Sequence, residues 1–415
     1  MAATHGSSLL RYTAAMFDTA ERHRVLSQPK PDPPWQGEPM FGSLYGDEEI
    51  EAAVAAMRDS ITPDKGFNSS AGSVADFETA FAAHVGTRHA IAINSAGSGL
   101  DMAMRYLELQ PGDEVIVPAI NFQAAALAVM GAGGQVVWSE VDARTFQMDP
   151  NDVEKRITPR TRAIFPVHMN GLSAPMDDLV EVAQQHPHEL HGPLAVVGDA
   201  ARACGGSYRG TKIGKKGLAT IFSFHTMKNI TTLGEGGMIT TDDDKAAATF
   251  RSARFFGIQT DVWGSSNMMT NVQAAVGLVQ LAKLDDLIER RRSLALHRHE
   301  MLDGLKPITR PFEPADCVHT YYLYTCLVPE DWAGTKRDEL MAMMASQFAV
   351  GCTVANPPVY EARGLLRQHT AGQRLPHSEA LGKRLFCVPI HPGMTPQQNQ
   401  YIAAALIECV ERMGA

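Results

Sequence analysis

Residues 219–241 read Ala-Thr-Ile-Phe-Ser-Phe-His-Thr-Met-Lys-Asn-Ile-Thr-Thr-Leu-Gly-Glu-Gly-Gly-Met-Ile-Thr-Thr. This stretch contains two short apolar runs, 219–224 and 237–241, and each run predicts a strand. Neither run alternates cleanly between polar and apolar residues, which is typical of strands that are buried on both faces. The stretch therefore indicates an α/β protein with a buried sheet.

The residues before this stretch repeat the pattern. Two helix-like segments, 98–107 and 122–130, lie among five more short apolar runs: 89–93, 114–117, 135–138, 162–167 and 194–197. Together with the first two runs they predict a mostly parallel, seven-stranded sheet with helices between the strands. In such sheets ligands bind beyond the carboxyl ends of the strands, so the chemistry is expected there.

The length of 415 residues is compatible with two or three domains. A proline-rich stretch at 28–35 predicts a linker, and the punctuation-poor stretch 271–302 predicts one long helix. Beyond it, strand-like runs at 321–328 and 386–390 and a helix at 395–413 predict an α+β lobe. We therefore predict an N-terminal arm at 1–44, a large domain at 45–290 and a small domain at 291–415.

The composition excludes several classes of protein. The formal net charge is −9, whereas a nucleic acid or an anionic membrane requires a basic face. No run approaches the ~18 consecutive apolar residues of a membrane span, and no signal peptide is recognisable at the N-terminus. The six cysteines form no CxxC pair, which predicts reduced thiols, no metal site and a cytoplasmic protein.

Two features at strand ends suggest a planar, phosphorylated ligand. Residues 94–99, Asn-Ser-Ala-Gly-Ser-Gly, follow a strand and open a helix, so the amides of Gly97 and Ser98 could bind a phosphate. The alternative is a plain turn with a serine cap. Phe122 follows the strand at 114–117 and could stack on a ring, although a lone Phe there is more often a core residue.

Two further features suggest the chemistry. Asp199 ends a buried strand and could hold a protonated pyridine nitrogen, or simply cap the next helix. Lys228 follows another buried strand and could form a Schiff base with an aldehyde, or be an ordinary ion-pair partner. The hydroxyl of Ser223 could bind the phosphate. In this order, the four features describe a pyridoxal 5′-phosphate (PLP) site.

The motifs around these residues resemble the DegT/DnrJ/StrS family of sugar and cyclitol aminotransferases, which are fold-type I PLP enzymes. The resemblance runs from about Tyr45 to the C-terminus. It is carried by residues 111–118, 159–168, 198–203, 223–232 with 234–237, 270–277 and 375–379.

The resemblance implies a role for each site residue. Lys228 would bind the cofactor aldehyde, Asp199 would pair with the pyridine nitrogen and Phe122 would stack on the ring. Gly97, Ser98 and Ser223 would bind the phosphate. Arg202 would contact the ring hydroxyl or face the substrate. Family members are homodimers, and Asn267 would reach the phosphate of the partner.

The resemblance also implies the reaction. An amino group would move from L-glutamate or L-glutamine to a keto sugar, nucleotide-linked in the expected case, or to a ketocyclitol, in natural-product or cell-surface sugar biosynthesis. Two alternatives stay open: a PLP-dependent dehydratase or aromatising enzyme on the same scaffold, and a catalytically silent PLP-binding regulator. Candidate substrate residues are His319, Asn356 and Tyr360, for which ordinary packing is the alternative.

Overall fold

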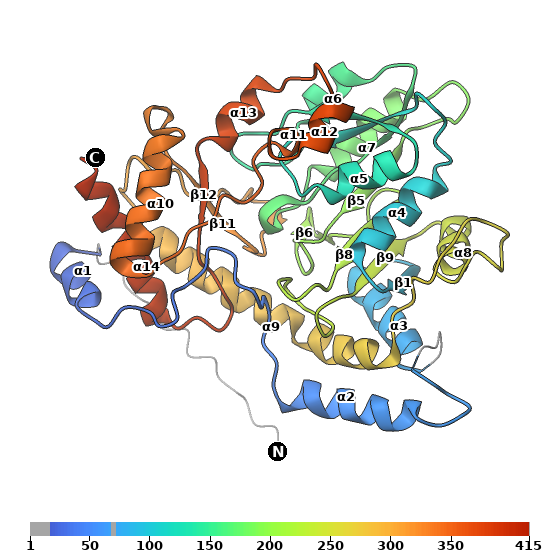
Figure 1. The fold of residues 1–415 in the computed structure, drawn as a ribbon, viewed down its shortest axis with the longest axis horizontal. Coiled ribbons are helices and arrows are strands. Elements are labelled where there is room, and N and C mark those ends of the chain that lie inside the picture. Colours follow the sequence, from blue (N-terminus) through green and yellow to red (C-terminus); the bar gives the residue numbers. More distant parts are fainter. Residues whose placement is uncertain (1–16, 68–71, 415) are drawn as a thin grey trace.

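A computed structural model describes residues 17–67 and 72–414 (Figure 1). Its main feature is a seven-stranded sheet in the order β1-β9-β8-β5-β4-β2-β3. Only β9 runs antiparallel to its neighbours. The strands are β1 His89–Ile93, β2 Glu114–Pro118, β3 Gln135–Ser139, β4 Thr161–Ile164, β5 Ala195–Asp199, β8 Ala219–Ser223 and β9 Gly237–Thr241. The predicted α/β fold with a mostly parallel, seven-stranded sheet is confirmed.

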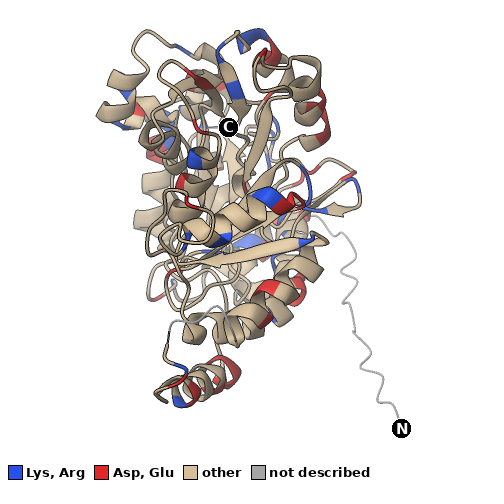
Figure 2. Cartoon of the chain, turned by 90° about the vertical axis from the view of Figure 1, so that its right-hand side faces the viewer, with Lys and Arg blue, Asp and Glu red and all other residues tan. Residues whose placement is uncertain are grey.

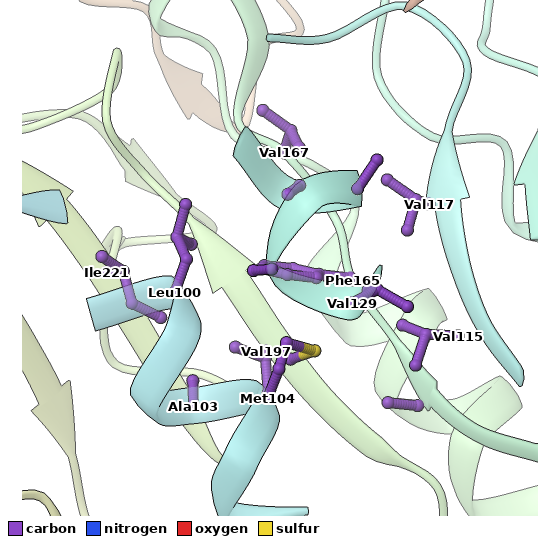
Figure 3. Packing of buried hydrophobic residues seen from close by; sticks show 14 of the residues in the cluster. Leu100, Ala103, Met104, Val115, Val117, Val129, Phe165, Val167, Val197 and Ile221 are labelled. Carbon is purple, nitrogen blue, oxygen red and sulfur yellow. The ribbon is translucent and has the colours of Figure 1, made fainter. Parts of the chain in front are cut away.

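Helices cover both faces of this sheet, which explains why its strands are apolar on both sides. In β8, Ile221 packs on one face with α4 (Ala96–Tyr106), α5 (Ala124–Gly131) and α8 (Asp244–Ala253). Figure 3 shows this cluster, with Leu100 of α4 beside Ile221. The next residue, Phe222, packs on the other face with α3 (Ser73–Val85) and α9 (Asn271–Met301).

A smaller lobe follows α9. It contains the antiparallel pair β11 (Tyr324–Leu327) and β12 (Leu385–Val388), with α10 (Thr335–Phe348) and α14 (Pro396–Arg412) packed in one cluster. Residue 290 lies inside the continuous helix α9, so the predicted division at 290/291 marks no break in the chain. The domain boundaries stay a prediction.

The remaining elements connect these parts. They are α1 Thr19–Leu26, α2 Asp47–Ser60, α6 Pro150–Arg156, η1 Met169–Gly171, α7 Met176–Gln185, β6 Ser207–Tyr208, β7 Thr211–Lys212, β10 Cys317–Val318, η2 Glu330–Trp332, α11 Val359–Ala362, α12 Gly364–His369 and α13 Pro376–Gly382. Figure 2 shows acidic and basic residues interspersed over the elements turned to the viewer. Within the described residues, no helix is both long enough and apolar enough to cross a membrane.

The predicted N-terminal arm lies partly outside the described residues, since these begin at residue 17. From there the arm packs against the small lobe. Val25 of α1 belongs to the core cluster of that lobe, and Trp35 forms a parallel bridge with Val350. The arm then reaches the large domain, where the amide of Gly42 donates a hydrogen bond to the carbonyl of Thr226, 2.9 Å away. The arm therefore contacts both lobes.

Candidate active site

Two neighbouring parallel strands deliver the central residues of the site. β5 ends at Asp199 and β8 ends at Ser223, with Asp199 in register with Ile221. Lys228 follows β8 after a short turn in which the Lys228 amide donates to the His225 carbonyl, 2.9 Å away. The Lys228 and Asp199 side chains interact electrostatically at this edge. The structure thus brings together two residues that lie 29 positions apart in the sequence.

Asp199 is a buried carboxylate that is available to a cation. Its side chain Oδ1 accepts a hydrogen bond from the Ala201 amide at 2.9 Å. Burial raises the pKa of Asp199, and the Ala201 hydrogen bond and the charges of Lys228 and Arg202 offset only part of that effect. Within the described part of the chain, no cationic nitrogen lies within 4.0 Å of the carboxylate. A protonated ring nitrogen would therefore find a buried anion here.

Lys228 is partly buried beside the same edge. Its Nζ donates a hydrogen bond to the Tyr322 hydroxyl at 3.2 Å and lies 4.9 Å from the centre of the Tyr322 ring. Burial, followed by the charge of Arg202, lowers the pKa of Lys228 to about 8. A much larger fraction of this amine is therefore neutral at physiological pH than for an ordinary lysine, and the neutral form is the nucleophile.

This lowered pKa gives a direct prediction. In competitive acetylation of the cofactor-free protein, followed by peptide mass spectrometry, the labelling midpoint of Lys228 should lie near pH 8. Exposed lysines should show midpoints near their ordinary pKa of about 10.4. A Lys228 midpoint equal to that of the exposed lysines would contradict this description of the site.

The turn before α4 has the shape of an anion site, and the predicted phosphate contacts of Gly97 and Ser98 stay predictions. The amide of Ser98 already donates to Oγ of Ser95, the N-cap, at 3.2 Å. The plain capped turn is therefore present. Above Gly97 the space is open, because a Cβ placed there would meet only Ser95 Oγ, at 3.7 Å. The helix N-terminus and this open space fit a phosphate group.

Phe122 and Ser223 flank the same edge. Phe122 follows β2 and is 50% exposed, so it is not the core residue that the alternative prediction described. An aromatic face so exposed beside a sheet edge fits a planar ligand. Ser223 is buried at the end of β8, where its Oγ accepts a long hydrogen bond from the His225 amide at 3.3 Å. Its own proton is left to donate to an oxyanion.

Known proteins share this sequence and fold. The model of the DegT/DnrJ/EryC1/StrS aminotransferase family matches residues 46–407. The chain belongs to this family. It is 33% identical to the spore coat polysaccharide biosynthesis protein SpsC of Bacillus subtilis (strain 168), over 89% of this chain and 96% of that protein. It is 36% identical to GDP-perosamine synthase of Caulobacter vibrioides, over 80% and 89% of the two chains.

Solved structures agree. The Streptomyces venezuelae (S. venezuelae) DesV structure, in complex with a ketimine intermediate, superposes with a TM-score of 0.80 at 33% identity, covering 88% of this chain and 95% of that one. An aminotransferase from Psychrobacter cryohalolentis shares the fold, with a TM-score of 0.81 at 24% identity, covering 93% and 100%. The protein is a PLP-dependent aminotransferase of the sugar aminotransferase family.

The donor set in this aminotransferase fits PLP. Lys228 offers a reactive amine, Asp199 a buried anion, Phe122 an exposed ring and Gly97 an open helix N-terminus. These are the groups that an aldehyde, a protonated pyridine nitrogen, a planar ring and a phosphate require. The individual cofactor contacts stay predictions.

Of the remaining predicted residues, Arg202, Asn356 and Asn267 take part in polar contacts near the site. Asn356 lies beside Arg202: with its amide oxygen facing the guanidinium, it accepts from Nη1 and Nη2 at 2.5 and 2.9 Å. Both are therefore part of one polar cluster. The carbonyl of Asn267 accepts from the Asn94 amide at 2.9 Å, next to the anion turn of its own chain. Its contact with a partner's phosphate stays a prediction.

His319 and Tyr360 show the packing that the sequence left open as the alternative. The His319 ring stacks on Tyr321 at 4.2 Å, and its Nδ1 accepts from the Tyr321 amide at 2.9 Å. The Tyr360 hydroxyl donates to Glu379 at 2.9 Å and accepts from the Leu375 amide at 3.1 Å. Both side chains are buried, so a substrate role for either stays a prediction without a free polar group to support it.

Sequence reasoning missed two residues at the site, Glu38 and Tyr322. The Tyr322 hydroxyl donates to Glu38 and accepts from Lys228. Glu38 lies in the arm, which follows no pattern that ties it to the sheet. Gly37 and Gly42 could have indicated that this segment packs against other backbone, because glycines on both sides of a carboxylate permit close approach.

Gly42 fixes the arm on the Lys228 turn. A Cβ at position 42 would collide with the Met227 carbonyl oxygen and lie 2.6 Å from that of Lys228. Gly42→Ala is expected to lower the free energy of unfolding by about 1–3 kcal/mol, because the contacted atoms are backbone and cannot give way. Gly131→Ala in α5 is the matched control, because its Cβ meets nothing within 4 Å. Equal thermal stability of the two variants would contradict the prediction.

Proposed function

We propose that this aminotransferase moves an amino group from L-glutamate or L-glutamine to a keto sugar, nucleotide-linked in the expected case, or to a ketocyclitol. The observation that carries the proposal is that Lys228, with its lowered pKa, and the buried Asp199 lie at the same end of the sheet. The names of the relatives support a sugar acceptor, since they include GDP-perosamine synthase and a spore coat polysaccharide biosynthesis protein.

PLP supplies an aldehyde and a ring that withdraws electrons from the carbon bearing the amino group. The chain's own residues do the rest. With PLP bound, Lys228 Nζ would act as a positioned general base and acid: it would take the proton from that carbon and later return it. Asp199 would keep the ring nitrogen protonated through a buried ion pair. Phe122 would stack on the ring, while Ser223 and the Gly97 amide would hold the phosphate.

We also propose that the protein is a homodimer that completes its sites at the interface. Helix α2 exposes apolar side chains at helical spacing, and each is more than a third exposed: Ile50, Val54, Met57 and Ile61, the last directly after the helix. A single-chain surface of this kind is typical of a protein contact. Sedimentation velocity should give the mass of two chains, and a Val54→Asp, Met57→Asp double variant should sediment as one.

The reaction is tested with the PLP-loaded enzyme. L-glutamate and L-glutamine are each incubated with a panel of nucleotide-linked keto sugars and ketocyclitols, and products are identified by mass. An amino sugar or aminocyclitol, formed in equal amount to the keto acid, is the expected result. Loss of water from the acceptor would instead indicate a dehydratase. No change in the absorbance spectrum of the bound PLP with either amino acid would indicate a silent PLP-binding protein.

A further inference from the structure

The N-terminal arm threads between the small lobe and the Lys228 turn, and two glycines fix it there. A Cβ at Gly37 would lie 2.5 Å from the Thr353 amide nitrogen and 2.8 Å from the Cys352 carbonyl carbon. At Gly42 the same test gives a collision with the Met227 backbone. The backbone on both sides of Glu38 is therefore packed against two different parts of the molecule, which sets the position of the Glu38 side chain.

The Glu38 carboxylate accepts the hydrogen bond of the Tyr322 hydroxyl. The Tyr322 hydroxyl donates to Glu38 Oε1, and Lys228 Nζ lies 3.2 Å from the same hydroxyl oxygen. A phenol has one proton, so with that proton on the Glu38 side the oxygen can only accept from Lys228. Lys228 thus donates a hydrogen bond to Tyr322, and Tyr322 donates one to Glu38. Tyr322 is 2% exposed, which excludes water as a competing partner for most of its surface.

Glu38 is ionised in this position. Burial alone would raise the pKa of Glu38, but the charge of Arg202, the Tyr322 hydrogen bond and the charges of Lys228 and His225 together outweigh burial, so that the pKa lies below its ordinary value. Arg202 Nη2 lies 4.0 Å from Glu38 Oε1, and the guanidinium stands 5.4 Å from the centre of the Tyr322 ring. The Glu38 anion therefore lies near Arg202 and is connected to Lys228 through the Tyr322 hydroxyl.

We propose that Glu38, carried into the site by the N-terminal arm, is a positioning residue for transamination that orients the Tyr322 proton away from Lys228 and holds Arg202 beside it. This inference rests on the role of Lys228 in the proposed function. During transamination Lys228 both takes and returns a proton. The Glu38–Tyr322 pair stabilises its proton-bearing state by offering an acceptor backed by a negative charge.

The charge balance at Lys228 defines the experiment. Among the described residues, the charged or titratable groups that act on its Nζ are Glu38 from the arm, Asp199 at the end of β5, Arg202 after it, Glu235 in the glycine-rich turn, and Tyr322 before β11. His225 faces Glu38 from the lysine turn itself. Among these, Glu38 and Glu235 are carboxylates that a Gln substitution can neutralise without touching the Asp199 position.

The test is competitive acetylation of Lys228 in the cofactor-free protein, with midpoints read by peptide mass spectrometry. Glu38→Gln keeps an acceptor for Tyr322 and removes the charge, so the Lys228 midpoint should fall by about one pH unit. Glu235→Gln is the matched control, because its 60% exposed carboxylate is screened by water and should shift the midpoint far less. Thermal melts verify that both variants are folded.

The proposal is overturned if Glu38→Gln leaves the Lys228 midpoint unchanged, or if Glu235→Gln lowers it equally. Should Glu38→Gln not fold, Tyr322→Phe decides instead, since loss of the hydroxyl should lower the same midpoint and an unchanged value would refute the chain of donors. The assay contains no sugar, so a wrong acceptor assignment in the proposed function would leave its outcome unaffected.

A second readout uses the PLP-loaded enzyme. Glu38→Gln is expected to lower kcat by about tenfold while KM for the amino donor stays within about twofold, because Lys228 and not substrate binding is affected. An increase of KM with unchanged kcat would overturn the proposal, since it would show that Glu38 binds substrate.

Discussion

Replacement of Lys228 by Ala is expected to lower kcat by at least about four powers of ten, the largest effect of any single substitution in this chain. The substitution removes the amine that would bind the cofactor, which is also the amine base that follows β8 beside Asp199. The measurement is single-turnover formation of the keto acid from L-glutamate, with borohydride reduction to detect covalent attachment of PLP.

Two controls separate chemistry from charge. Lys228→Arg keeps the positive charge near Asp199 and Tyr322 but has no nucleophilic amine, so it should be as inactive as Lys228→Ala. Lys215→Ala removes a lysine that pairs with Asp242 on the surface and should retain full activity. A rate for Lys228→Ala within tenfold of the unmodified enzyme would contradict the role of Lys228 as the cofactor-binding amine and general base.

Replacement of Asp199 by Asn is expected to cost about 3–5 kcal/mol of interaction with the protonated ring, which corresponds to roughly two to four powers of ten in kcat. The amide keeps the size of the side chain and can still accept from the Ala201 amide, so the local backbone is preserved. The measurement is kcat with saturating PLP, which removes any loss of cofactor affinity from the comparison.

The same substitution should act in the opposite direction on the cofactor-free protein. Burial holds the folded-state pKa of Asp199 above its unfolded-state value, so its contribution to stability is present at low pH and is lost as pH rises through the folded-state pKa. At neutral pH the buried charge therefore costs stability, and Asp199→Asn should melt at the same or a higher temperature than the unmodified chain. A large drop in melting temperature would mean that Asp199 is structural.

Much of this protein follows from local sequence. All seven central strands are where apolar runs predict them, because each run is buried on both faces and bounded by polar or small residues. The run at 162–167 is the least accurate, since β4 ends at Ile164 before Phe165-Pro166. Proline has no amide proton for the ladder, which explains the early end.

The site divides in the same way. Lys228 and Asp199 are predictable because a charged side chain at the end of a buried apolar strand is costly unless it has a partner. Ser98 is less so, since whether its amide faces a ligand or the Ser95 cap depends on the rotamer of one side chain. Tyr322 lies in an apolar segment where it is indistinguishable from the core residues Tyr321 and Tyr324.

The sequence by itself determined where the seven central strands lie and that Lys228 and Asp199 belong to the site. These features depend on runs of apolar residues and on the residues that follow them at the strand ends. Only the tertiary structure decided that Glu38 joins them, from 190 residues before Lys228. The physical reason is that its place is set by backbone packing at Gly37 and Gly42 against distant segments. Such contacts leave no periodic trace in the sequence.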